Sequence, residues 1–157
     1  AVATGGLFLL VGVLERNLGI RSIDEMGGIA SKAPLFTVFF GIMVLCTVGI
    51  PGTNGFVAEL LIVLGLFKYN AFAGILSALT VLVAASYMFW LFQKAILANS
   101  ENDVSAMVDL DWKEVLGLVP LSLLIIAMGI YPDLFLYKIE PTIQHYLIDI
   151  LHIGARA

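Results

Sequence analysis

The chain has 157 residues, of which 61% are hydrophobic and only 13% are charged. Its mean hydropathy of +1.02 is well above that of soluble domains, so we expect a membrane protein. The net charge of -4 comes mostly from two polar segments, 15–25 and 101–114, and gives no support to nucleic-acid binding. A single cysteine, Cys46, excludes an internal disulfide and a cysteine metal cluster.

The first predicted element is an apolar helix over residues 1–14. It would cover about 21 Å, less than a hydrocarbon core of ~30 Å, so it is interpreted as the end of a truncated spanning helix. A signal peptide is the alternative, but no basic segment precedes the apolar run, and Glu15-Arg16 follows where small residues belong. A polar connection from Glu15 to Lys32, with the Gly27-Gly28 pair, then indicates a loop at a membrane face.

The next element is predicted to be a transmembrane helix broken in its middle, at 34–50 and 55–67. A continuous helix over both parts would be about 50 Å long, too long for one span, and the second part alone is too short for another. Two half-helices fit better, and the break then lies beside a pathway or a packed core. A plain turn between two separate spans is the alternative.

Five residues define this predicted break: Gly49, Pro51, Gly52, Thr53 and Gly55. We expect the first half-helix to end near Gly49 with exposed carbonyl groups, and the second to begin near Thr53 or Asn54 with free amides.

Glu59 is the only Asp or Glu between Glu25 and Glu101, and its neighbours are apolar. An ionisable group in a bilayer costs roughly 2.5 kcal/mol or more on insertion scales, which favours a functional role. Helical spacing places Gly52 and Gly55 on its face, leaving room for water or a neighbouring helix. The alternative is a structural carboxylate, kept protonated or paired inside a bundle.

The remaining chain predicts a long apolar helix at 71–97, an acidic loop at 99–111 and another span at 113–131. After Pro132, apolar residues recur at spacings of three and four, which is typical of an amphipathic surface helix over 132–157. His145 and His152 are interpreted as solvated residues on its polar face rather than metal ligands.

The predicted fold is therefore an all-α polytopic membrane protein, a partial helix bundle with one discontinuous transmembrane helix and a C-terminal amphipathic helix. With 34–67 counted as one broken span, five cations share one side and favour a cytoplasmic 15–32 loop: Arg16, Arg21, Lys32, Lys94 and Lys113. Two separate spans would give a stronger bias, so the charge pattern mildly opposes the break that the lengths favour.

Several stretches carry a resemblance to a known family. They are Gly6-Leu7-Phe8-Leu9-Leu10-Val11-Gly12, Glu15-Arg16, Gly27-Gly28 and, above all, Gly49-Ile50-Pro51-Gly52-Thr53-Asn54-Gly55-Phe56-Val57-Ala58-Glu59. Together they resemble the M-type antiporter-like subunits of bacterial proton-pumping NADH:quinone oxidoreductase, respiratory complex I, whose mitochondrial equivalent is chain 4. The resemblance spans nearly the whole chain and is closest over residues 5–67, while the tail matches in layout more than in residues.

The resemblance implies the last quarter to third of a fourteen-helix subunit: the end of helix eleven, broken helix twelve, helices thirteen and fourteen, and the amphipathic tail as a separate segment after residue 131. It implies that Glu59 ends a line of buried ionisable groups and takes part in proton transfer. Related subunits more often carry lysine at this position, so Glu59 indicates the M-type. The family's other buried ionisable groups fall outside this chain.

The same resemblance implies a non-redox subunit with no cofactor or metal of its own. NADH, flavin, iron-sulfur clusters and quinone are expected elsewhere in the complex. The expected partners are other membrane subunits, including related antiporter-like ones, and the lipid bilayer of the bacterial inner (plasma) membrane, in preference to the mitochondrial one. Two alternatives remain: a subunit of a multisubunit sodium/proton antiporter, and a structural membrane scaffold.

Overall fold

A computed structural model describes residues 1–19, 23, 26–98 and 106–154, with side chains to Ile143 and at His145 and Tyr146. Within these ranges the regular structure is entirely helical, which confirms the predicted all-α class. Its elements are α1 (Val2–Leu18), α2 (Ile29–Lys32), α3 (Pro34–Thr47), α4 (Asn54–Tyr69), α5 (Ala71–Phe92), the π-helical η2 (Gln93–Leu97), α6 (Trp112–Ile130) and α7 (Asp133–Gly154). The predicted loop cation Arg21, the acidic segment 99–105 and the side chain of His152 lie outside the described residues.

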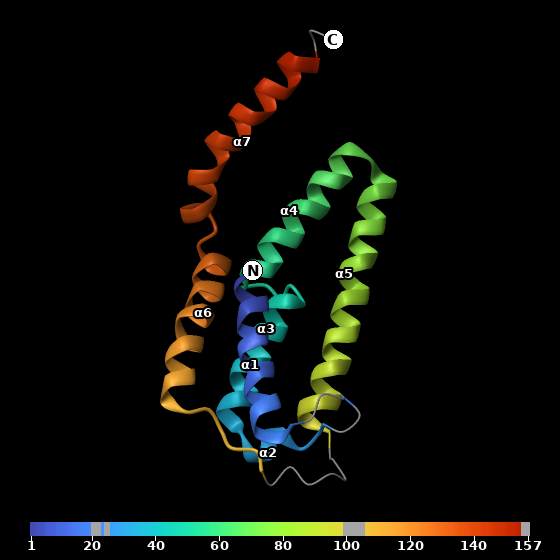
Figure 1. Ribbon diagram of the computed structural model, residues 1–157. Coiled ribbons are helices and arrows are strands. Elements are labelled where there is room, and N and C mark those ends of the chain that lie inside the picture. The colour runs from blue at the N-terminus through green and yellow to red at the C-terminus, as the bar shows by residue number, and fades with distance from the viewer. Residues whose placement is uncertain (20–22, 24–25, 99–105, 155–157) are drawn as a thin grey trace.

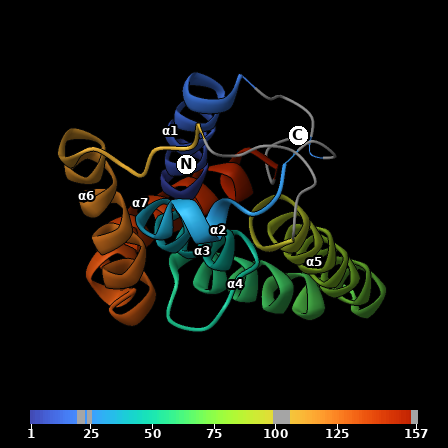
Figure 2. The ribbon, with the colours of Figure 1, turned by 90° about the horizontal axis from the view of Figure 1, so that it is seen from below.

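Helix α3 occupies the centre of the bundle. It contacts α1, α5 and α6, which surround it when the molecule is seen from below (Figure 2). Its side chains Phe36 and Met43 are fully buried, as is Leu10 of α1. Helix α1 ends at Leu18 rather than at the predicted residue 14, because Glu15 and Arg16 continue the helix beyond its apolar part.

The discontinuous transmembrane helix is confirmed. Helices α3 and α4 run end to end in the same general direction, and α5 returns alongside both (Figure 1). The alternative interpretation, a plain turn between two separate spans, is therefore wrong. The helical parts differ from the predicted 34–50 and 55–67, since α3 ends at Thr47 and α4 continues to Tyr69.

Helices α5 and α6 are long and apolar enough to cross a membrane, over Ala71–Leu97 (27 residues) and Trp112–Ile130 (19 residues). Asn70 alone separates α4 from α5, and its side chain caps α5 by accepting the N–H of Phe72 at 2.8 Å. The last turn of the α5 span is π-helical, and it turns Ala95 and Ile96 into the core.

Helix α7 continues from α6 after a short turn and leans over the end of the molecule that holds α4 (Figure 1). Both Leu134 and Tyr137 are largely exposed, so the described part of α7 covers no core. A hollow of about 630 Å³ separates it from Leu61 of α4. Its role as an amphipathic surface helix therefore stays a prediction.

Candidate functional site

Two glycines with positive φ form the turn between α3 and α4. Gly49 has φ +73° and Gly52 has φ +95°, a left-handed backbone that costs an L-residue with a side chain roughly 1–2 kcal/mol. The turn at Gly49 directs backbone N–H groups back onto the end of α3. Three carbonyls there accept them: Val44 from Val48 at 2.8 Å, Leu45 from Ile50 at 3.1 Å and Cys46 from Gly49 at 3.2 Å. The expectation of exposed carbonyls at this end was therefore wrong for these three groups.

The start of α4 is packed tightly against its surroundings. A Cβ added at Gly55 would overlap the carbonyl oxygen of Cys46 at the end of α3, and one added at Gly129 of α6 would overlap the backbone of Gly52. The Cys46 thiol also donates to the Asn54 Oδ1 atom at 2.8 Å. Contacts of this kind, with almost no side-chain volume between backbones, hold α3, α4 and α6 together at the break.

Thr53 and Pro51 complete the connection between the half-helices. Thr53 occupies the N-cap position of α4, but its hydroxyl donates to the carbonyl of Ile50 at 2.7 Å and does not cap the helix. Pro51 is exposed. The second half-helix was predicted to begin near Thr53 or Asn54, and α4 begins at Asn54.

Glu59 lies on α4, half-buried, with its carboxylate against Gly49 across the break. A Cβ at Gly49 would overlap Oε2 of this carboxylate, so the contact requires glycine. Of the two glycines predicted on the helix face of Glu59, Gly55 lies one turn before it on α4 and admits the end of α3 at Cys46, whereas Gly52 precedes the helix. Spacing along α4 could not anticipate which residue the end of α3 would present.

A hollow of about 290 Å³ lies beside Glu59 between α4 and α5. Residues from the break and from both helices line it: Gly49, Phe56, Glu59, Leu60, Val63, Ala78, Val81 and Leu82. Glu59 is the only ionisable group in this lining. The site thus presents one carboxylate to an otherwise apolar space, where a proton can be held but no second side chain of the lining can accept it.

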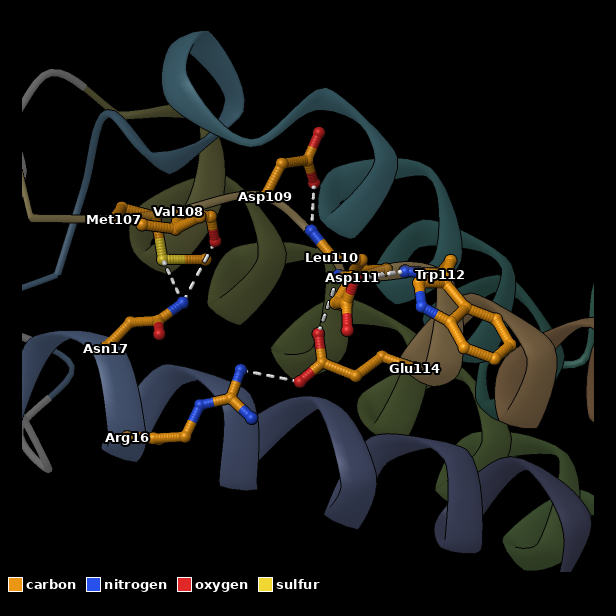
Figure 3. Close-up of polar contacts among 9 residues, drawn as sticks. All are labelled: Arg16, Asn17, Met107, Val108, Asp109, Leu110, Asp111, Trp112 and Glu114. Carbon is orange, nitrogen blue, oxygen red and sulfur yellow. Dashed lines mark hydrogen bonds and ion pairs between the residues drawn. The ribbon is translucent and has the colours of Figure 1, made fainter.

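A second polar group, not identified from the sequence, lies at the opposite end of α3. Asp109, in the loop before α6, accepts backbone N–H groups from the first turn of α3. Nearby, Arg16 of α1 pairs with Glu114 of α6, and Asn17 donates to the carbonyl of Val108 (Figure 3). No local pattern predicts these contacts, because the partners lie more than 70 residues apart in the chain.

Comparisons with known proteins agree with this architecture. Residues 1–86 match the family model described as NADH:quinone oxidoreductase/Mrp antiporter, TM. The NADH-quinone oxidoreductase subunit M of Rickettsia typhi is 36% identical over 148 residues, covering 94% of this chain and 30% of the relative. The NADH-ubiquinone oxidoreductase chain 4 of Marchantia polymorpha is 34% identical over 153 residues, covering 94% and 31%.

Among solved structures, a chain of respiratory complex I from Thermus thermophilus with bound NADH superposes with a TM-score of 0.76 at 34% identity. The match covers 85% of this chain and 28% of that one. The chain therefore spans less than a third of the length of the relatives it matches.

Proposed function

Because the chain belongs to the NADH:quinone oxidoreductase/Mrp antiporter transmembrane family, we propose that it is part of a membrane subunit that translocates protons as NADH is oxidised and quinone is reduced. The relative named NADH-quinone oxidoreductase subunit M and the solved chain of respiratory complex I both match most of this chain. In this proposal the subunit works within the bacterial inner membrane, beside other membrane subunits that include related antiporter-like ones.

Glu59 is the residue that carries the proposal. Its carboxylate is the only ionisable group of an apolar hollow, and it lies at a helix break, where backbone at membrane depth is tolerated only beside protein or a hydrated cavity. A carboxyl group placed there can take up a proton on an Oε atom and release it again. The walls formed by Phe56, Val63 and Val81 are apolar and offer no second group for the proton, so in this proposal proton exchange depends on waters that reach this carboxylate.

The rest of the site positions this carboxylate. Gly49 lets it approach the end of α3, and the contact of Gly129 with Gly52 fixes the break against α6. The chain performs no redox step in this proposal. NADH, flavin, iron-sulfur clusters and quinone belong to other subunits, and the subunit's contribution is to hold and move a proton.

Two substitutions test the role of Glu59 in the full-length subunit within the intact complex. Glu59→Gln keeps the shape and removes the titratable group, and we expect it to lower proton pumping relative to NADH oxidation by roughly tenfold or more. Glu59→Asp keeps a carboxyl group and is expected to retain most of the pumping. Normal pumping by a fully assembled Glu59→Gln complex would overturn the proposal.

The same variants separate the two other functions considered for this chain. A structural scaffold predicts that Glu59→Gln lowers assembly and NADH oxidation together, with the number of protons pumped per electron unchanged. A sodium/proton antiporter subunit predicts that the purified assembly holds neither flavin nor iron-sulfur clusters.

A further inference from the structure

Helix α3 has no N-terminal cap of its own. Its N-cap residue is Ala33, whose methyl group accepts no hydrogen bond, and its first residue, Pro34, has no N–H to donate. The next two amides, of Leu35 and Phe36, are those that an N-cap side chain normally satisfies. Phe36 is fully buried, so an acceptor for its amide has to come from the protein.

Asp109 supplies this acceptor from 73 residues away along the chain. Its Oδ2 atom accepts the Leu35 N–H at 3.0 Å, and its Oδ1 atom accepts the Phe36 N–H at 2.9 Å. The carboxylate thus occupies the place of the missing cap, and its negative charge faces the positive end of the helix dipole.

The segment that carries Asp109 is itself held by other elements. Met107 and Leu110, on either side of it, are only 5% and 8% exposed. Asn17, near the end of α1, donates to the Val108 carbonyl at 2.9 Å (Figure 3). The segment that carries Asp109 is therefore also held by α1, and the first turn of α3 binds to this segment.

We propose that Asp109 is a positioning residue for Glu59, acting through the full length of α3. A helix of 14 residues transmits a shift along its axis from one end to the other, and only Val48 separates its last residue, Thr47, from Gly49. Holding the first turn of α3 at Asp109 places Gly49 where the Glu59 carboxylate meets it. This inference rests on the proposed role of Glu59 in proton transfer.

The test first compares three single variants of the full-length subunit in the intact complex, with proton pumping and NADH oxidation measured together. Asp109→Ala removes the cap and is expected to lower pumping relative to NADH oxidation about fivefold, the usual effect of losing a cap on a helix equilibrium. Asp109→Asn keeps one acceptor oxygen but sets an NH2 group against the second N–H, so its pumping ratio is expected to lie between those of Asp109→Ala and the unmodified complex. Asp111→Ala removes the cap of α6 instead and leaves the pumping ratio unchanged.

A second-site rescue separates capping from a general need for Asp109. Ala33→Ser adds a hydroxyl at the N-cap of α3, the position from which a side chain normally accepts these amides, and combined with Asp109→Ala it is expected to restore the pumping ratio. If Asp109→Ala alone does not assemble, the double variant provides the test. An assembled complex that pumps protons supports the capping role of Asp109, and failure to restore assembly and pumping overturns it.

A normal pumping ratio in an assembled Asp109→Ala complex also overturns the inference. Glu59→Gln, measured in parallel, keeps the two claims apart. Normal pumping in Glu59→Gln removes the proposed function, whereas impaired pumping in Glu59→Gln with normal pumping in Asp109→Ala removes only the role of Asp109.

Discussion

At its N-terminal end, α3 is held by a carboxylate, because two of its backbone N–H groups donate charge-assisted hydrogen bonds to Asp109. At its C-terminal end the same helix is held by glycine contacts and backbone hydrogen bonds, and the nearest carboxylate, Glu59, meets it at Gly49. A charged group binds the end that lies among polar loops, while glycine contacts surround the end that faces the hollow. The difference leaves Glu59 without a strong fixed partner in that hollow, as proton exchange requires.

The largest effect is expected from a methyl group added at the break. Gly49→Ala imposes a left-handed alanine and pushes its Cβ into the Glu59 carboxylate, so we expect pumping relative to NADH oxidation to fall roughly tenfold or more. Gly52→Ala is the matched control, because Gly52 also has a positive φ but its Cβ would meet nothing within 4 Å. Equal losses in the two variants would mean that contact with Glu59 is irrelevant.

A smaller effect, on stability, is expected where α6 supports the break. Gly129→Ala drives a Cβ into the backbone of Gly52 and should destabilise the subunit by about 1–3 kcal/mol. Gly117→Ala, on the same helix, has open space around its Cβ and should be neutral or slightly stabilising. Thermal inactivation of the purified complex measures both, and a stable Gly129→Ala complex would show that α6 is not needed to hold the break.

The smallest effect is expected at the polar end of the bundle. The Arg16 side chain is 63% exposed in its ion pair with Glu114, and pairs of this kind contribute about 0.2–1 kcal/mol. Arg16→Ala should therefore lower the denaturation midpoint only slightly, and less at high salt than at low salt. A large drop in the denaturation midpoint that does not depend on salt would mean that Arg16, rather than Asp109, holds the polar end of the bundle.

The broken helix could be predicted because lengths constrain it. An apolar stretch of 34–67 is too long for one straight span, and the Pro51-Gly52 pair marks where it breaks. The position of Glu59 as a lone carboxylate could also be predicted, because it follows directly from where the charged residues lie in the sequence. What these two features share is that both are local properties of the chain.

The partners of these residues could not be predicted. Which glycine faces Glu59 depends on how the chain folds back at Gly49, and the cap of α3 comes from Asp109, 74 residues from the amide it binds. The end of α1 was placed too early because hydropathy marks where a helix leaves the apolar layer, not where its hydrogen bonding stops. Contacts between distant segments depend on how the helices pack together, and this packing cannot be read from a single sequence.

The most direct measurement for the central claim is whether the Glu59 carboxyl group changes protonation during turnover. Infrared difference spectra of the intact complex, recorded with and without NADH, report carboxyl groups that gain or lose a proton. The account predicts a carboxyl C=O band that is present in the unmodified complex, absent in Glu59→Gln and shifted in Glu59→Asp. Identical difference spectra from the unmodified and Glu59→Gln complexes would contradict it.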